Sequence, residues 1–460
     1  MLRTGSVSAA VAIVVGFCLT YSVATQSAFA GLGGLGAQRA VGGVMIDPDG
    51  SVRAASKAEQ QEMASLIRDA VGRADGQLAV ATPRRFVSLK SLQKAIAEAE
   101  QTGGTIDADL GFLAGLQRIE FLIVDAENQD ILIAGPAEPW KLNADGTVVG
   151  KQNGQSVLRL EDLMTAFASV ETARDAGGIR CSIEPTAEGR QRLQKYLAGV
   201  RLRSGQNPKF LEAGMREAFG PQQILLDGLP TDSRMARTLV AADFEMKRIA
   251  MALVDSPVAG LPSYLEMARN TRQSIAQNPR WWMACDYEPI ARDNDGLVWK
   301  LTGQGVKTLT EQDIVKRDGS VAGSGQTDRI AQRWATTMTE QYESLSRTKP
   351  VFRDLRNAMD MVVIATLIRQ QNLDTQAGLD LSVLRGESAS VPTDAYPMPR
   401  TLQPQCSFIR GNAGWTVTAS GGVNIDPFSV VQAPVQSSDL RLLVVDRPAS
   451  DRWWWDSNER

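Results

Sequence analysis

The segments of this chain that favour β-strands occur in neighbouring pairs, and this grouping limits the possible folds more than any other sequence feature. Residues 119–124 and 131–134 are rich in Ile, Leu and Val, and the polar residues 125–130 between them have turn composition. This pattern predicts an antiparallel hairpin, and we expect residues 140–149 to continue it as a meander. Strands grouped in this way, with helices between them at irregular spacing, indicate an α+β fold and not a doubly wound parallel sheet.

Further strands are expected in the second half of the chain. Residues 224–226 predict a short buried strand, and residues 281–283, 297–301 and 306–309 predict a second meander. Residues 401–460 also have β-like composition. The predicted architecture is therefore a set of antiparallel hairpins and meanders packed with helices, followed by a C-terminal β-rich segment.

The strongest helical pattern runs from Asp232 to Val254. Its apolar residues recur at steps of three or four, which places them on one helix face: Met235, Leu239, Ala242, Met246, Ile249 and Leu253. Thr186 is expected to cap a helix that reaches about Ala198. The same periodicity predicts further helices over residues 57–73, 88–99, 159–170, 262–276, 326–345 and 351–370.

The first thirty residues have the pattern of a secretory signal peptide. Arg3 gives a positive start, residues 7–19 are apolar, and the stretch from Ser27 to Ala30 ends in the small-x-small pattern that signal peptidase accepts. We expect cleavage after Ala30 and export to the periplasm or beyond; the alternative is an uncleaved N-terminal anchor. No later segment has 18 consecutive apolar residues, so we expect no transmembrane segment in the mature chain.

Composition shifts suggest how the chain is divided. A flexible lead-in is expected to follow the leader, and a linker with three prolines is expected ahead of the C-terminal segment. The expected units are the signal peptide (1–30), the lead-in (31–40), an α+β core (41–320) with possible subdomains 41–200 and 201–320, a helical pair (321–375), the linker (376–400) and the β-rich segment with its Trp tail (401–460).

Two short segments far apart in the chain are almost identical. Residues 42–48 and 421–427 agree at six of seven positions, as Gly-Gly-Val-Met-Ile-Asp-Pro and Gly-Gly-Val-Asn-Ile-Asp-Pro. One interpretation is that the two segments pair in one sheet and close the chain on itself. The alternative is that both only share a strand-plus-turn pattern.

Histidine is absent from the whole chain, which excludes several kinds of site. Neither a Ser-His-Asp or Cys-His nucleophile system nor a His-ligated metal can be built. Cys181, Cys285 and Cys406 remain after the leader; they are widely spaced, no Cys-x-x-Cys pair exists, and their pairing stays open. We expect no metal and no cofactor.

The formal net charge of −3 gives no basic footprint, so we expect no nucleic-acid partner.

Four carboxylates are candidates for acid/base chemistry. Asp243 and Glu245 lie on the strongest helix, where Asp243 can pair with Lys247 four residues on. Asp286 and Glu288 lie in the densest acidic stretch. The alternative for Asp243 is a salt bridge on a helix surface or between domains.

Tryptophans are the binding candidates, since they can stack on sugars or meet a partner: Trp281, Trp282, Trp453, Trp454 and Trp455. For the first two, core packing is the alternative.

Four phrases, in this order along the chain, resemble an uncharacterised family of exported planctomycete proteins, classed only as a domain of unknown function. They lie at residues 135–140, 181–186, 241–249 and, as Trp281-Trp282 followed by Asp295-Gly296-Leu297, at 281–297. The resemblance covers residues 42–431. It implies export and brings no assigned activity and no catalytic residue.

Two functions are compatible with these features. The first is a non-enzymatic exported protein that binds a partner of the cell envelope or the extracellular space, or helps to assemble the envelope. The alternative is a carboxylate-based hydrolase of glycans or other envelope polymers, with acids among the four named above. Such a hydrolase needs two carboxyl groups about 5–9.5 Å apart in one cleft.

The leader generates the first testable prediction. The mature protein, recovered from its host, should begin at Gly31, because the small residues before it fit the peptidase site. N-terminal sequencing together with intact mass measures this directly. A mature protein that retains Met1 to Ala30 would contradict the prediction.

Overall fold

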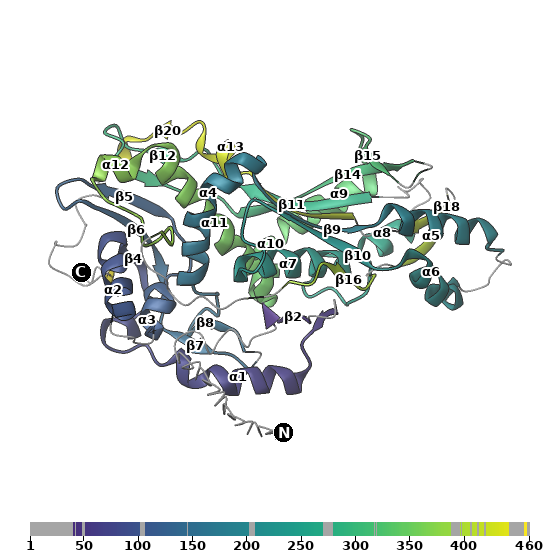
Figure 1. Cartoon of the computed structure of the whole chain (residues 1–460), viewed down its shortest axis with the longest axis horizontal. Helices are drawn as coiled ribbons and strands as arrows, with labels where there is room; N and C mark the ends of the chain where they lie inside the picture. The colour runs from purple at the N-terminus through teal and green to yellow at the C-terminus, as the bar shows by residue number, and fades with distance from the viewer. Residues whose placement is uncertain are drawn as a thin grey trace, which may run out of the picture.

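The computed structural model describes residues 40–457 apart from residues 42, 48–50, 102–105, 145, 202–207, 270–278, 317, 319, 388–395, 397, 405–406, 412–413, 418–419 and 441–454. Two seven-stranded sheets, with helices packed against them, form an α+β fold (Figure 1). We name them the β6 sheet and the β11 sheet after an inner strand of each.

The β6 sheet has the strand order β20-β12-β13-β5-β6-β4-β21. Its centre is the predicted hairpin, with Leu122 opposite Ile133. The pair β12 and β20 is parallel, and the other neighbours are antiparallel. The strands are β4 (Thr82–Ser88), β5 (Phe121–Asp125), β6 (Asp130–Ala137), β12 (Ala291–Arg292), β13 (Val298–Lys300), β20 (Val435–Gln436) and β21 (Trp455–Ser457).

The β11 sheet has the order β15-β14-β11-β19-β9-β10-β16. Its one parallel pair among the described strands joins β11 to β19, with Trp281 opposite Gly421. The strands are β9 (Ile179–Pro185), β10 (Gln222–Asp227), β11 (Pro279–Asp286), β14 (Gly305–Val315), β15 (Val321–Gly323), β16 (Thr401–Leu402) and β19 (Ser420–Ile425).

Three small ribbons stand apart from these sheets. They are the three-stranded β1 (Ala40–Val41), β2 (Val44–Ile46) and β3 (Val52–Ala54), and the hairpins β7 (Trp140–Leu142) with β8 (Val148–Gly150) and β17 (Phe408–Gly411) with β18 (Gly414–Val417). Residues 140–149 therefore form a hairpin of their own and do not continue the first meander, which corrects that expectation.

The expected second meander is also wrong. β11 pairs with β14, but β13 lies in the other sheet and pairs with β5. Composition predicted each strand correctly and could not predict which sheet it joins. The strand predicted at residues 224–226 is β10. It was expected to be buried, but Leu225 is 49% exposed, so one face of β10 is open.

Each predicted helix has a counterpart in the structure, and local capping explains where two of them begin. Helix α6 (Glu212–Phe219) was not predicted. Ser56 and Glu59 form a capping box at the start of α1, and the Thr186 hydroxyl accepts the backbone N–H of Gly189 at the start of α5. The described helices of eight or more residues are α1 (Lys57–Val71), α2 (Leu89–Gln101), α4 (Leu160–Ala176), α5 (Ala187–Gly199), α6 (Glu212–Phe219), α7 (Arg234–Ala250), α9 (Arg329–Glu340) and α11 (Pro350–Gln370).

Shorter helices complete the description. The predicted helix over 326–345 is divided at Gln341 into α9 and α10, and that over 262–276 is described only as α8. These segments are η2 (Gly76–Ala79), α3 (Ala108–Gly111), η3 (Leu113–Gly115), η4 (Pro208–Leu211), α8 (Tyr264–Arg269), α10 (Tyr342–Thr348), α12 (Leu373–Ala377), α13 (Pro427–Val431) and η5 (Ser438–Leu440).

Helices α7 and α11 pack together in the core. Helix α11 is buried from Val351 to Ile368, so the fold encloses it on all sides instead of covering one apolar stripe. Helix α7 packs against β9 and β19 of the β11 sheet. Leu239 and Met246 are fully buried as predicted, whereas Leu253 lies beyond the end of α7 and is half-buried.

The two near-identical segments do not pair. One forms β2 of the three-stranded ribbon, and the other forms β19 between β9 and β11. Their glycines have different roles: Gly43, at φ 82°, lies in the turn between β1 and β2, whereas a Cβ on Gly421 would meet the Trp281 carbonyl oxygen at 1.7 Å. The pairing hypothesis is therefore wrong, although both β2 and β19 pack against α7.

Both large sheets draw strands from the expected units 41–200, 201–320 and 401–460. These units are therefore interleaved in space, and the division of the chain at the expected boundaries stays a prediction. Among the residues that the structure describes, no helix combines the length and the apolar character needed to cross a membrane.

The packing of α7 generates a stability prediction. Leu239→Ala should lower the free energy of unfolding by about 2–5 kcal/mol, because the fully buried side chain leaves a cavity. Leu225→Ala, at a half-exposed position on β10, is the matched control and should cost less than about 1 kcal/mol. Chemical denaturation of both variants measures the difference, and equal losses would contradict the assigned core.

Candidate functional site

The Asp243–Lys247 pair lies between α7 and the β11 sheet. Asp243 has no exposed surface, and Lys247 is 3% exposed. The Lys247 ammonium donates to Asp243 Oδ2 at 2.9 Å, to the Ile183 carbonyl at 2.9 Å and to the Gly421 carbonyl at 3.3 Å. A lysine has three N–H donors, so all three are used. The Ile183 N–H donates to the same Asp243 oxygen at 3.2 Å.

This arrangement fastens α7 to two neighbouring strands. Burial raises the pKa of Asp243 to about 6, against the attraction of Lys247. A pKa in that range suits a general acid, but a carboxylate without exposed surface has no path to a substrate in this structure. The predicted pair therefore forms, and it lies in the core instead of on a helix surface. Its catalytic role stays untested.

Glu245 is held in a similar way on another side of α7. It is 3% exposed and accepts from Lys349 at 3.1 Å and from Arg248 at 3.5 Å. Lys349 immediately precedes α11, so this pair links the two core helices. Both carboxylates of α7 are thus engaged by cations inside the fold.

The other two carboxylate candidates lie elsewhere. Asp286 ends β11 and lies 3.6 Å from the Lys307 ammonium on β14, with 37% of its side chain exposed. Alternation along β11 places Asp286 on the same face as Trp282, opposite the face that α7 covers. Glu288 follows the strand and is exposed. The structure therefore does not bring the two acidic pairs into one site.

The tryptophan candidates divide in the same manner. Trp281 is buried and contacts Tyr264 and Trp334 edge-on, with ring centroids 4.9 and 5.0 Å apart, as expected for core packing. Trp282 is half-buried on the opposite face of the β11 sheet. Trp453 and Trp454 lie outside the described residues. Trp455 is described only as part of β21, opposite Val87 of β4.

Two cysteines can be placed. Cys181 and Cys285 are free thiols, and burial raises the pKa of Cys285 to about 12 and that of Cys181 well above its usual value. Such thiols are poor nucleophiles. Cys406 lies outside the described residues. Within the described part of the chain, no three metal-ligating His, Cys, Asp or Glu side chains come together.

Buried ion pairs that the sequence did not reveal hold the core helices. Arg234 on α7 binds Asp162 of α4 and Asp354 of α11. Arg118 binds Asp360 of α11 through two nitrogens at 2.9 Å. Each pair joins segments more than 70 residues apart, a separation at which no helical or strand spacing gives a signal.

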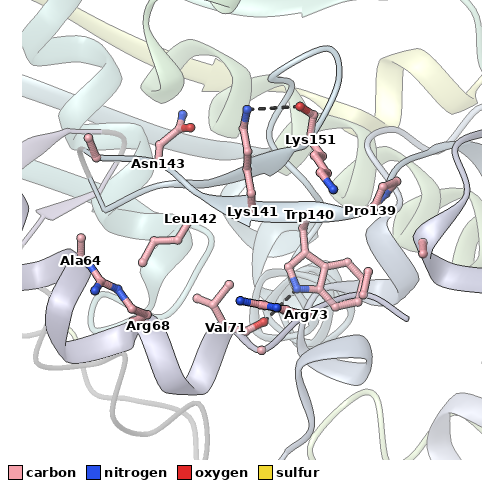
Figure 2. A pocket seen from close by; sticks show the side chains of 14 residues that line it. Ala64, Arg68, Val71, Arg73, Pro139, Trp140, Lys141, Leu142, Asn143 and Lys151 are labelled. Carbon is pink, nitrogen blue, oxygen red and sulfur yellow. Dashed lines mark hydrogen bonds between the residues drawn. The ribbon is translucent and has the colours of Figure 1, made fainter. Parts of the chain in front are cut away.

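The open cavity with the clearest chemistry is a groove between α1 and the β7–β8 hairpin (Figure 2). Its volume is about 790 Å³, within the range of small-molecule sites. Trp140 is buried at its floor, where the indole N–H donates to the Val71 carbonyl at 2.9 Å and the ring packs against Phe112. This bond ties the hairpin to the end of α1. The groove is lined by Ala64, Arg68, Val71, Gly72, Arg73, Ala74, Ala79, Pro139, Trp140, Lys141, Leu142, Asn143, Ala144 and Lys151.

The lining is cationic. It contains Arg68, Arg73, Lys141 and Lys151, all exposed, and none of its fourteen residues is Asp or Glu. The nearby Glu138 carboxylate accepts the backbone N–H groups of residues 152 and 153. Because the described lining contains arginines and lysines but no carboxylate, it does not supply an acid/base pair.

The sequence analysis missed this groove. It predicted α1 and the hairpin, but their contact depends on packing between segments about 70 residues apart. The sequence signal was present only as cations at the end of one helix and around one turn, a pattern that is common on protein surfaces.

A family model described as a protein of unknown function (DUF1598) matches residues 181–264. The match runs from β9 to the start of α8 and includes α7 with Asp243 and Lys247. Two of the four phrases that carry the sequence resemblance, 181–186 and 241–249, fall within it; planctomycete origin and export stay predictions. Searches of curated proteins and of solved structures found no match.

The fastening of α7 generates a mutational prediction. Asp243→Leu should lower the free energy of unfolding by about 3–5 kcal/mol, because it leaves one N–H of the buried Lys247 ammonium without an acceptor. The double variant Asp243→Leu/Lys247→Met should recover most of this loss, since neither charge remains. Glu98→Gln, at the exposed i,i+4 pair with Lys94, is the control and should cost about 0.5 kcal/mol or less. A small loss in Asp243→Leu would contradict the structural role.

A pH dependence follows from the same carboxylate. Its folded-state pKa of about 6 lies above the unfolded value of about 3.9, so the folded protein binds this proton more tightly. The contribution is fully present below pH 4 and is lost as the pH rises through 6. Relative to the Asp243→Leu/Lys247→Met variant, the wild type should lose up to about 3 kcal/mol between pH 4 and 6. Denaturation curves across this window measure it, and a constant difference would contradict the raised pKa.

Proposed function

We propose that this protein is exported and binds a ligand of the cell envelope or extracellular space without transforming it, and that the groove between α1 and β7 is the binding site. The observation that supports binding over catalysis is the state of the candidate acids. Asp243 and Glu245 form ion pairs with lysines in the core, and Asp286 lies on the other face of the β11 sheet.

The groove has the physical character of a ligand site. Its floor is apolar and fixed by the Trp140 hydrogen bond, and its rim is polar and exposed. Pockets of this kind use an apolar base for contact area and a few polar groups for orientation. Export is supported by the N-terminal leader pattern.

The test uses the mature chain from Gly31 and a panel of neutral and acidic glycans. We expect thermal stabilisation by at least one glycan, lost in Ala79→Trp, which places a large ring into the groove from the exposed end of η2. Assays of new reducing ends should remain at background. Hydrolysis that disappears in folded Asp286→Asn or Glu288→Gln would overturn this proposal in favour of the hydrolase.

A further inference from the structure

Given that the groove is the ligand site, we infer that its ligand carries two or more anionic groups, carboxylate or phosphate, on a scaffold of several units. The inference rests on the proposed function and adds the chemistry of the ligand. It follows from three properties of the groove: its positive charge, its arginines without an ion-pair or hydrogen-bond partner among the described residues, and its volume.

The charge of the groove contrasts with that of the chain. The whole protein has 52 acidic and 49 basic residues, so a surface of average composition would mix both signs. The groove instead has four cations and no carboxylate among its described lining residues. A cleft of one sign concentrates ligands of the opposite sign near its low-dielectric floor.

The two arginines among these cations are available to a ligand. Within the described part of the chain, Arg68 and Arg73 take part in no ion pair or side-chain hydrogen bond. The negative end of the α1 dipole accounts for a cation in its last turn. However, the Val71 carbonyl there already accepts from Trp140, and the dipole does not account for Lys141 and Lys151 on the hairpin.

The side chains are arranged in two groups. Figure 2 shows Trp140 and Leu142 pointing from β7 toward α1, with Arg73 beside the indole and Arg68 further along the helix. Lys141 points to the other side of β7, where its ammonium donates to the Lys151 carbonyl at 3.1 Å. The two guanidinium groups thus flank the apolar floor, and guanidinium forks bind carboxylate and phosphate through two hydrogen bonds each.

The volume argues against a single small ion. About 790 Å³ lies toward the upper part of the 300–1,000 Å³ range of small-molecule sites. Two separated guanidinium groups in such a space fit a ligand with separated anionic groups. We therefore expect Arg68 and Arg73 to supply most of the recognition and the two lysines to supply less.

The experiment is calorimetric titration of the mature chain with trigalacturonate, tripolyphosphate and, as the neutral counterpart, maltotriose. We expect one of the two anions to bind and maltotriose to bind at least about tenfold more weakly. Arg68→Gln/Arg73→Gln should weaken anion binding by about tenfold or more, equivalent to one lost charged hydrogen bond. Lys141→Gln/Lys151→Gln should weaken it by a smaller factor, and higher salt should weaken it further.

Lys195→Gln/Lys316→Gln removes two exposed cations outside the groove and is the charge-matched control, which should bind as the wild type does. Thermal melting confirms that each variant is folded. The inference is overturned if neither anion binds or if Arg68→Gln/Arg73→Gln keeps the wild-type affinity. Binding of maltotriose that is lost in Ala79→Trp but unaffected by the arginine changes would end this inference and leave the proposed binding function intact. The two anions distinguish carboxylate from phosphate recognition.

Discussion

The centre of this fold depends on the three hydrogen bonds that the buried Lys247 ammonium donates beneath the β11 sheet. A buried ammonium costs several kcal/mol unless each of its donors finds an acceptor. Here the acceptors are the carboxylate of Asp243 on the same helix and carbonyls of two strands, one of them 174 residues away in the chain. The hydrogen bonds of this one ammonium therefore fix where α7 lies along the sheet and how β9 aligns with β19. The glycine at 421 allows this because a Cβ there would collide with β11.

The same rule organises the rest of the core. Helix α11 is buried on all sides, yet it carries Asp354 and Asp360, which bind arginines from α7 and from the chain ahead of β5. Tyr287 donates to Asp360 as well, at 2.7 Å. Apolar contacts supply most of the favourable free energy of burial, but they tolerate many arrangements. Directional bonds to buried charges restrict the core to one of them.

This contrast separates the structural charges from the available ones. In the core, Asp243, Glu245 and Arg234 each have partners of opposite sign. At the groove, Arg68 and Arg73 flank an apolar floor and Lys141 extends on the other side of β7, without a neutralising carboxylate in the described lining. Charges left unpaired beside a cavity keep their capacity to bind a ligand, whereas paired charges in a core do not. The distinction supports placing function at the groove and not at the acids of α7.

The sequence by itself determined the α+β class, the hairpin of β5 and β6, the capped start of α5 and the buried face of α7. Each of these depends on neighbours a few residues apart, through side-chain periodicity or a single cap. It also indicated that Asp243 and Lys247 would pair, since they are four residues apart on a helix. Only the tertiary structure decided that this pair is buried, that β13 leaves its neighbours for the other sheet, and that the two Gly-Gly segments lie in different sheets. It also decided that Arg68 and Lys151 line one groove. These outcomes depend on contacts between residues tens to hundreds of positions apart, and spacing along the chain carries no record of such contacts.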